Sequence, residues 1–133
     1  MKKLLETLKR KLSSSDEQEA SMQANQDYAR FTLFYESLVI GTLTADKGVW
    51  TFEYSEEFKK QNAFKPLVNF PDKSKVYTQG TLWPFFASRI PGVSQPRVQE
   101  VLKAKNIDSE NTVDLLKIFG KHSISNPFEL VVQ

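Results

Sequence analysis

Aromatic side chains are concentrated in one stretch of this 133-residue chain, and that concentration limits where a core can form. Thirteen of the sixteen aromatic residues fall between Phe31 and Phe86. Large aromatic side chains dominate the burial of apolar surface in protein cores. The length suits one domain rather than two. We therefore expect a single folded domain over residues 28–133.

The residues before this domain divide into two parts. Residues 1–12 predict an amphipathic basic helix, because four leucines recur at helical spacing among lysines and an arginine. This helix is either a segment that docks on a membrane surface or a partner, or a frayed terminus that packs on the domain. Residues 13–27 contain almost no large apolar side chain and predict a flexible linker.

The first half of the domain predicts an antiparallel meander. Residues 31–35 and 38–43 are rich in β-branched and aromatic side chains and are separated by the two residues typical of a hairpin. A turn at residues 46–48 leads to a third run, 49–54, with strict alternation. Its aromatic residues share one face, which favours a core role over a platform on which a ligand stacks. They are Trp50, Phe52 and Tyr54.

The second half predicts mostly helix. Ser55-Glu56-Glu57 suits a capped helical turn, and the proline-bracketed segment 66–72 suits an edge strand or an extended loop. About three helices follow, for which Thr81, Ser94 and Asp108 are the candidate N-caps. The last of these helices ends at Gly120, and residues 128–131 suit a final strand. The expected class is α+β: a small antiparallel sheet followed by helices, with the extra helix at 1–12.

The composition offers little chemistry for catalysis. There is no cysteine, His122 is the single histidine, and five scattered glycines form neither common phosphate-binding loop. A surface or structural role for His122 is favoured over that of a general base. The net charge of +2 is too small to indicate nucleic-acid or membrane binding. No apolar run approaches the about 18 residues of a membrane span. We expect a cytoplasmic non-enzyme with no catalytic residue, metal or cofactor.

Four motifs occur in an order that resembles a known kinase subdomain. They are Ile40-Gly41-Thr42-Leu43, Gly48-Val49-Trp50-Thr51-Phe52-Glu53-Tyr54, Leu82-Trp83-Pro84-Phe85-Phe86-Ala87 with Arg89-Ile90-Pro91, and Leu115-Leu116-Lys117-Ile118-Phe119-Gly120. Together they resemble the amino-terminal subdomain of HipA-type serine/threonine kinases. Residues 1–27 have no counterpart in this resemblance, so no role for them follows from it.

The resemblance implies a function in trans. A full HipA-type kinase continues far beyond this subdomain, so we expect that this chain, which ends at Gln133, is not itself a kinase. A chain of this size resembles the HipS family of the tripartite HipBST toxin–antitoxin systems. In those systems the small protein is the antitoxin of the HipT kinase, and HipB binds DNA. The implied partners are a HipT-like kinase and, through the complex, a HipB-like protein.

An alternative function stays open beside this one. The aromatic strand and the basic helix at 1–12 could serve a nucleic-acid-binding or autoregulatory protein. The two functions differ in a simple observable. An antitoxin that contacts neither nucleic acid nor membrane directly forms a complex largely insensitive to salt, whereas nucleic-acid affinity falls steeply with salt.

The expected partner-binding segment begins the first of the three predicted helices. A domain that rejoins a kinase as a separate chain keeps large apolar side chains outside its own core. On a helical wheel Trp83 lies at the edge of the core face. It either projects outward as a binding hot spot or closes the core. The predicted partner-binding residues are Trp83, Pro84, Phe85, Phe86 and Arg89.

Overall fold

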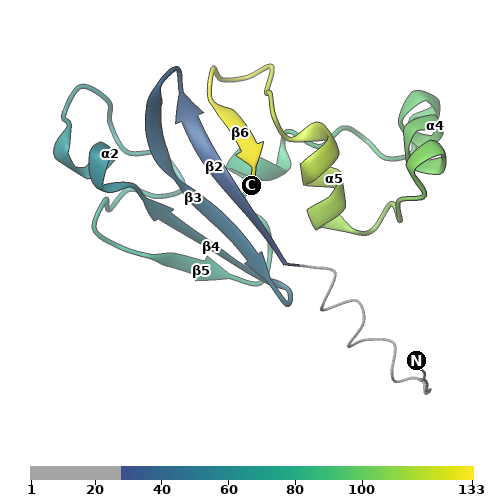
Figure 1. The fold of residues 1–133 in the computed structure, drawn as a ribbon, viewed down its shortest axis with the longest axis horizontal. Coiled ribbons are helices and arrows are strands. Elements are labelled where there is room, and N and C mark those ends of the chain that lie inside the picture. The colour runs from purple at the N-terminus through teal and green to yellow at the C-terminus, as the bar shows by residue number, and fades with distance from the viewer. Residues whose placement is uncertain (1–27) are drawn as a thin grey trace.

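A five-stranded antiparallel sheet runs through residues 28–133, the part of the chain that this computed structural model describes (Figure 1). The strand order is β5-β4-β3-β2-β6, and all neighbours are antiparallel. The strands are β2 (Ala29–Tyr35), β3 (Leu38–Asp46), β4 (Val49–Tyr54), β5 (Tyr77–Gln79) and β6 (Glu129–Val132). With the helices described below, the expected α+β class is confirmed. The predicted helix at 1–12 and linker at 13–27 lie outside the described residues.

Two tight turns connect the first three strands where the sequence predicts them. Tyr35 pairs with Leu38 across the first turn, and Asp46 pairs with Val49 across the second. In the second turn Lys47 and Gly48 have φ angles of 53° and 84°. Positive φ at both central residues suits the right-handed twist of a two-residue hairpin. The turn chemistry therefore fixes the register of β3 against β4.

The aromatic face of β4 lies in the core. Trp50, Phe52 and Tyr54 are all buried, whereas Val49 and Glu53 on the opposite face are exposed. The Phe52 ring stacks on that of Phe70, with centroids 4.3 Å apart. Burying each such side chain stabilises the fold by about 1.5–3 kcal/mol. The predicted core role is confirmed, and the face is covered rather than open to a ligand.

The segment between β4 and β5 holds one short helix and a long loop. Helix α2 (Glu56–Lys60) has Ser55 as its N-cap, and the Ser55 hydroxyl accepts a hydrogen bond from the Phe58 amide at 2.9 Å. This is the predicted capped turn. Residues 66–72 form a loop, and the edge strand on this side of the sheet is β5 instead.

Three helices follow β5, but their predicted caps are wrong. They are α3 (Pro84–Ala87), α4 (Pro96–Lys105) and α5 (Thr112–Phe119), and their N-caps are Trp83, Gln95 and Asn111. The prolines that open α3 and α4 set where those helices begin. At α5 the side chain of Asn111 accepts from the Asp114 amide, while Asp108 accepts from the Glu110 amide in the preceding turn. Asp108 thus closes a local turn and not the helix end.

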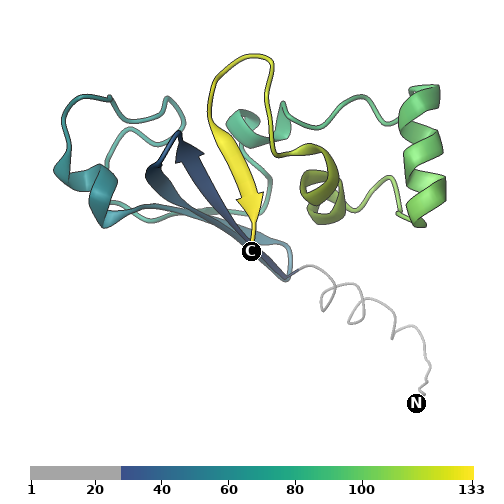
Figure 2. The same ribbon diagram turned by 45° about the horizontal axis from the view of Figure 1, so that its top comes forward.

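Helices α2, α3 and α5 contribute buried side chains to the main core beside the sheet, whereas those of α4 belong to a separate cluster. Phe86 of α3 reaches the main core, and its ring centroid is 5.7 Å from that of Phe52. Helix α4 lies beyond α5, away from the sheet, where Val98, Leu102 and Leu115 form a second small cluster (Figure 2). The final strand predicted at residues 128–131 is confirmed as β6, and the sheet is interrupted by helices more than the expected order of sheet first and helices afterwards, because α2 precedes β5. Among the described helices, none has the length and apolarity needed to cross a membrane.

The hydroxyl of Tyr54 ties the sheet to the loop that covers it. It donates to the carbonyl of Phe70 at 2.5 Å and accepts from the amide of Leu67 at 2.8 Å. Burial raises the pKa of Tyr54 to about 12. Between the usual value near 10 and this value, the folded chain keeps a proton that the unfolded chain releases. Stability from this group therefore falls as pH rises through that interval.

We expect Tyr54→Phe to lower the free energy of unfolding by about 1–3 kcal/mol at neutral pH, because two buried backbone groups lose their partner. The substitution should also flatten the decline in stability between about pH 10 and 12. Urea unfolding at several pH values, with the unmodified protein in parallel, measures both effects. An equal alkaline decline in both proteins would contradict the assignment to Tyr54.

Candidate partner-binding surface

Trp83 is buried, so of the two positions left open for it the core interpretation is confirmed. Its exposed fraction is 7%. The indole meets the ring of Phe70 edge to face, with centroids 4.8 Å apart. Trp83 precedes α3 and has extended backbone angles, φ −66° and ψ 148°, so a helical wheel does not describe its direction.

The other apolar residues of the predicted site divide between core and surface. Phe86 is fully buried. Pro84 is exposed and Phe85 is half-buried. The amide of Phe85 donates to the side-chain oxygen of Asn69 at 3.0 Å, which holds the start of α3 against the covering loop. Pro84 and Phe85 are therefore the predicted site residues that this segment presents to solvent.

Arg89, the remaining predicted partner-binding residue, is buried within the domain. It is 5% exposed, and its guanidinium lies 5.6 Å from the centre of the Phe85 ring. Nη1 donates to the carbonyls of Gly120 at 3.1 Å and Lys121 at 3.3 Å. Nη2 donates to the side-chain oxygen of Asn126 and to the carbonyl of Phe128, both at 3.1 Å. Burial lowers the pKa of Arg89 to about 10, so the group stays charged at neutral pH.

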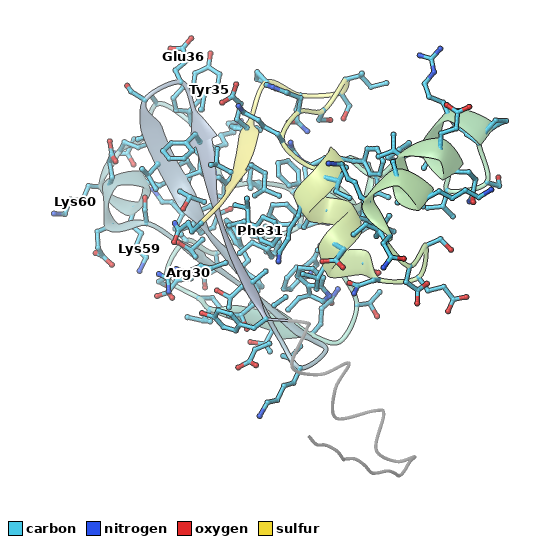
Figure 3. The ribbon with its side chains drawn as sticks, turned by 45° about the vertical axis from the view of Figure 1, so that its right-hand side comes forward. Arg30, Phe31, Tyr35, Glu36, Lys59 and Lys60 are labelled. Carbon is cyan, nitrogen blue, oxygen red and sulfur yellow. The ribbon has the colours of Figure 1, made fainter. Side chains whose placement is uncertain are left out.

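Phe85 is the last of four partly exposed aromatic rings that lie in a row, which we call the aromatic strip. The aromatic strip consists of Phe64, Tyr35, Phe128 and Phe85. Neighbouring ring centroids along this row are 5.0, 5.8 and 5.8 Å apart. Figure 3 shows Tyr35 beside Glu36 at the tip of the β2–β3 hairpin. The rings thus line one end of the sheet.

Sequence reasoning missed the aromatic strip because its rings come from four separate segments. Phe64 follows α2, Tyr35 ends β2, Phe128 precedes β6 and Phe85 belongs to α3. No spacing rule connects these positions. The only indication in the sequence was the large number of aromatic residues. They are more than the core-facing positions of the predicted strands can hold.

The surface offers little to support nucleic-acid binding through the sheet. The aromatic face proposed for stacking is buried, so that part of the alternative is wrong. Among the lysines near this side of the sheet, Lys73 donates to the carbonyls of Lys59 and Gln61 at 3.3 and 3.0 Å. The ammonium of Lys75 lies 5.2 Å from the centre of the Tyr77 ring. Local contacts therefore engage both cations.

The single histidine of the described residues lies on the surface. His122 is exposed, and its Nδ1 lies 3.7 Å from a carboxylate oxygen of Glu129, also exposed. Within residues 28–133, no three histidine, aspartate or glutamate side chains are grouped to hold a metal ion.

Comparison with known families agrees with the motifs found in the sequence. The HipA N-terminal domain family matches residues 31–124, well over half of the chain. No curated protein matches the chain. The match extends from β2 through α5 and includes all four motifs, among them Gly41 and Gly120. That family is the non-catalytic amino-terminal part of HipA. The chain therefore belongs to the HipA N-terminal domain family, as a HipS-like protein.

Proposed function

We propose that this protein is an antitoxin that binds a HipT-like serine/threonine kinase in trans and inhibits it. Membership of the HipA N-terminal domain family supports the choice of partner, because the same domain in HipA belongs to a kinase. Through the kinase complex, the protein would also associate with a HipB-like DNA-binding protein. The proposed site of action is the cytoplasm.

The aromatic strip is the observation that supports a binding function most directly. A domain without a binding partner gains the most folding free energy when its large aromatic rings are buried in its own core. Here Phe64 keeps 38% of its surface exposed, and Tyr35, Phe85 and Phe128 are partly exposed beside it. Aromatic side chains are enriched at protein interfaces, where truncating one central residue removes about 2 kcal/mol or more of binding energy.

Phe85 is the ring to test first, because it belongs to both the predicted site and the aromatic strip. We expect Phe85→Ala to weaken binding to the HipT-like kinase by about thirtyfold, which corresponds to about 2 kcal/mol. Calorimetric titration with the purified kinase measures the affinity. Autophosphorylation of the kinase, with and without the protein, measures inhibition.

Tyr28→Ala is the matched control for that experiment. Tyr28 is also an exposed aromatic residue, but it precedes β2, at the end of the strand opposite Tyr35. We expect the affinity of the Tyr28→Ala variant for the kinase to stay within twofold of that of the unmodified protein. The proposed function is wrong if the unmodified protein does not bind the kinase, or if the bound kinase autophosphorylates at its free rate. Equal losses in both variants would remove the aromatic strip from the interface.

A further inference from the structure

We infer that residues 120–128, here called the clamped loop, form a second part of the partner-binding surface, with Ile124 as its apolar anchor and Arg89 as the residue that positions it. The choice of a kinase as partner rests on the proposed function. The inference depends on three features: how the loop is held, what its tip exposes and which surface it joins.

The loop is held by one buried cation. The four hydrogen bonds of the Arg89 guanidinium reach oxygens that span Gly120 to Phe128. Within residues 28–133, Arg89 forms no ion pair with a carboxylate, so these oxygens and the Phe85 ring compensate its charge. Burying a cation is costly without such partners. Among residues 28–133, Arg89 is the only charged residue that is buried.

Further hydrogen bonds shape the loop from within. The Ser125 amide donates to the Ser123 hydroxyl at 3.1 Å, and the two serine hydroxyls lie 2.9 Å apart. The Phe128 amide donates to the side-chain oxygen of Asn126 at 3.1 Å. At its start, the carbonyl of Lys121 accepts from the amide of Leu130 in β6. The loop therefore has a defined conformation on both sides of its tip.

The tip exposes an aliphatic side chain that the fold does not use. Ile124 is fully exposed, with a relative accessibility of 108%. A single exposed aliphatic residue is ordinary on a protein surface. This one differs because a buried arginine fixes the segment that presents it. Fixing a loop in its bound shape lowers the entropy lost on association.

The clamped loop is continuous with the aromatic strip. Phe128 belongs to both: its carbonyl accepts from Arg89, and its ring lies beside those of Tyr35 and Phe85. Glu129, the next residue, pairs with Phe34 near the end of β2. The loop and the β2–β3 hairpin tip therefore lie at the same end of the sheet (Figure 1). The fitting partner surface is an apolar pocket that accepts a β-branched aliphatic side chain, beside a flatter apolar area that covers the rings.

The positioning role of Arg89 is tested on the protein alone. Arg89→Lys keeps the charge but removes the planar fork of donors. We expect amide hydrogen exchange in residues 121–128 to become at least tenfold faster, while exchange in β3 and β4 is unchanged. Arg97→Lys, at an exposed arginine in α4, is the matched control. It should leave amide exchange unchanged both in residues 121–128 and in β3 and β4. Unchanged exchange in the loop of the Arg89 variant would overturn the positioning role.

The anchoring role of Ile124 is tested by binding. We expect Ile124→Ser to weaken binding to the HipT-like kinase at least tenfold, with an unchanged unfolding midpoint. Val68→Ser is the matched control: Val68 is also β-branched, lies in a loop and is 93% exposed, and its variant should bind within twofold of the unmodified protein.

The possible outcomes separate this inference from the proposed function. Binding of Ile124→Ser within twofold of the unmodified protein, or an equal loss in the Val68 variant, would overturn the anchor and leave the proposed function intact. If the unmodified protein does not bind the kinase, the proposed function and the role of Ile124 both fail. The exchange experiment decides the role of Arg89 in either case.

Discussion

Replacing Trp83 by alanine is expected to lower the free energy of unfolding by about 3–5 kcal/mol, the range for removing a large aromatic side chain from a core. The indole is 7% exposed and packs against Phe70, which in turn stacks on Phe52. Its removal leaves a cavity between α3 and the loop that covers the sheet. Denaturant unfolding followed by circular dichroism measures the loss.

Two comparisons make the Trp83 result specific. Pro84→Ala changes the adjacent exposed residue and should alter stability far less, because surface substitutions usually stay within about 0.5 kcal/mol. Kinase affinity is measured on the folded fraction of the Trp83 variant. Unchanged stability together with a thirtyfold loss of affinity would contradict the buried position and assign Trp83 to the interface.

The strands were more predictable than the helices because their side chains alternate. Along β4 the two-residue period assigns each residue to one face, and one face is buried. The region around α3 has no comparable constraint. A wheel drawn over residues 81–90 assumes a continuous helix, whereas the helix extends only over Pro84–Ala87. Trp83 is extended rather than helical, so the wheel could not decide between an exposed and a buried position for it.

Arg89 and the aromatic strip show a second limit of sequence patterns, which is that they do not indicate contacts between distant segments. The acceptors of the Arg89 guanidinium lie 31 to 39 residues further along the chain. No pattern of neighbouring residues predicts hydrogen-bond acceptors so far along the chain, and arginine is mostly found at protein surfaces. The aromatic strip likewise depends on how β2, α3 and the segment before β6 meet. The sequence motifs indicated that the α3 region takes part in partner binding. Only the tertiary packing distinguishes a buried positioning residue such as Arg89 from an exposed contact residue such as Phe85.

The second large effect is expected at Gly41, in the first of the four family motifs. A Cβ atom at this position would lie 2.5 Å from the carbonyl oxygen of Glu53 and 2.7 Å from Cζ of Phe52. Side-chain carbons do not approach other atoms so closely, so the backbone of β3 would have to move away from that of β4, and the Phe52 ring would have to turn as well. Phe52 is fully buried and stacked on Phe70, which leaves it little freedom to move.

We therefore expect Gly41→Ala to destabilise the protein by about 3 kcal/mol or more, at or above the upper end of the usual cost of overpacking a core. Gly80→Ala is the matched control, because an added Cβ there meets no atom within 4 Å and should change stability by less than about 0.5 kcal/mol. Thermal and denaturant unfolding of both variants measure the difference. If Gly41→Ala were as stable as Gly80→Ala, the close approach of β3 to Phe52 would not be required for folding. The expected loss would instead give the motif glycine a steric cause: the missing side chain leaves room for the Phe52 ring of β4 beside its neighbouring strand β3.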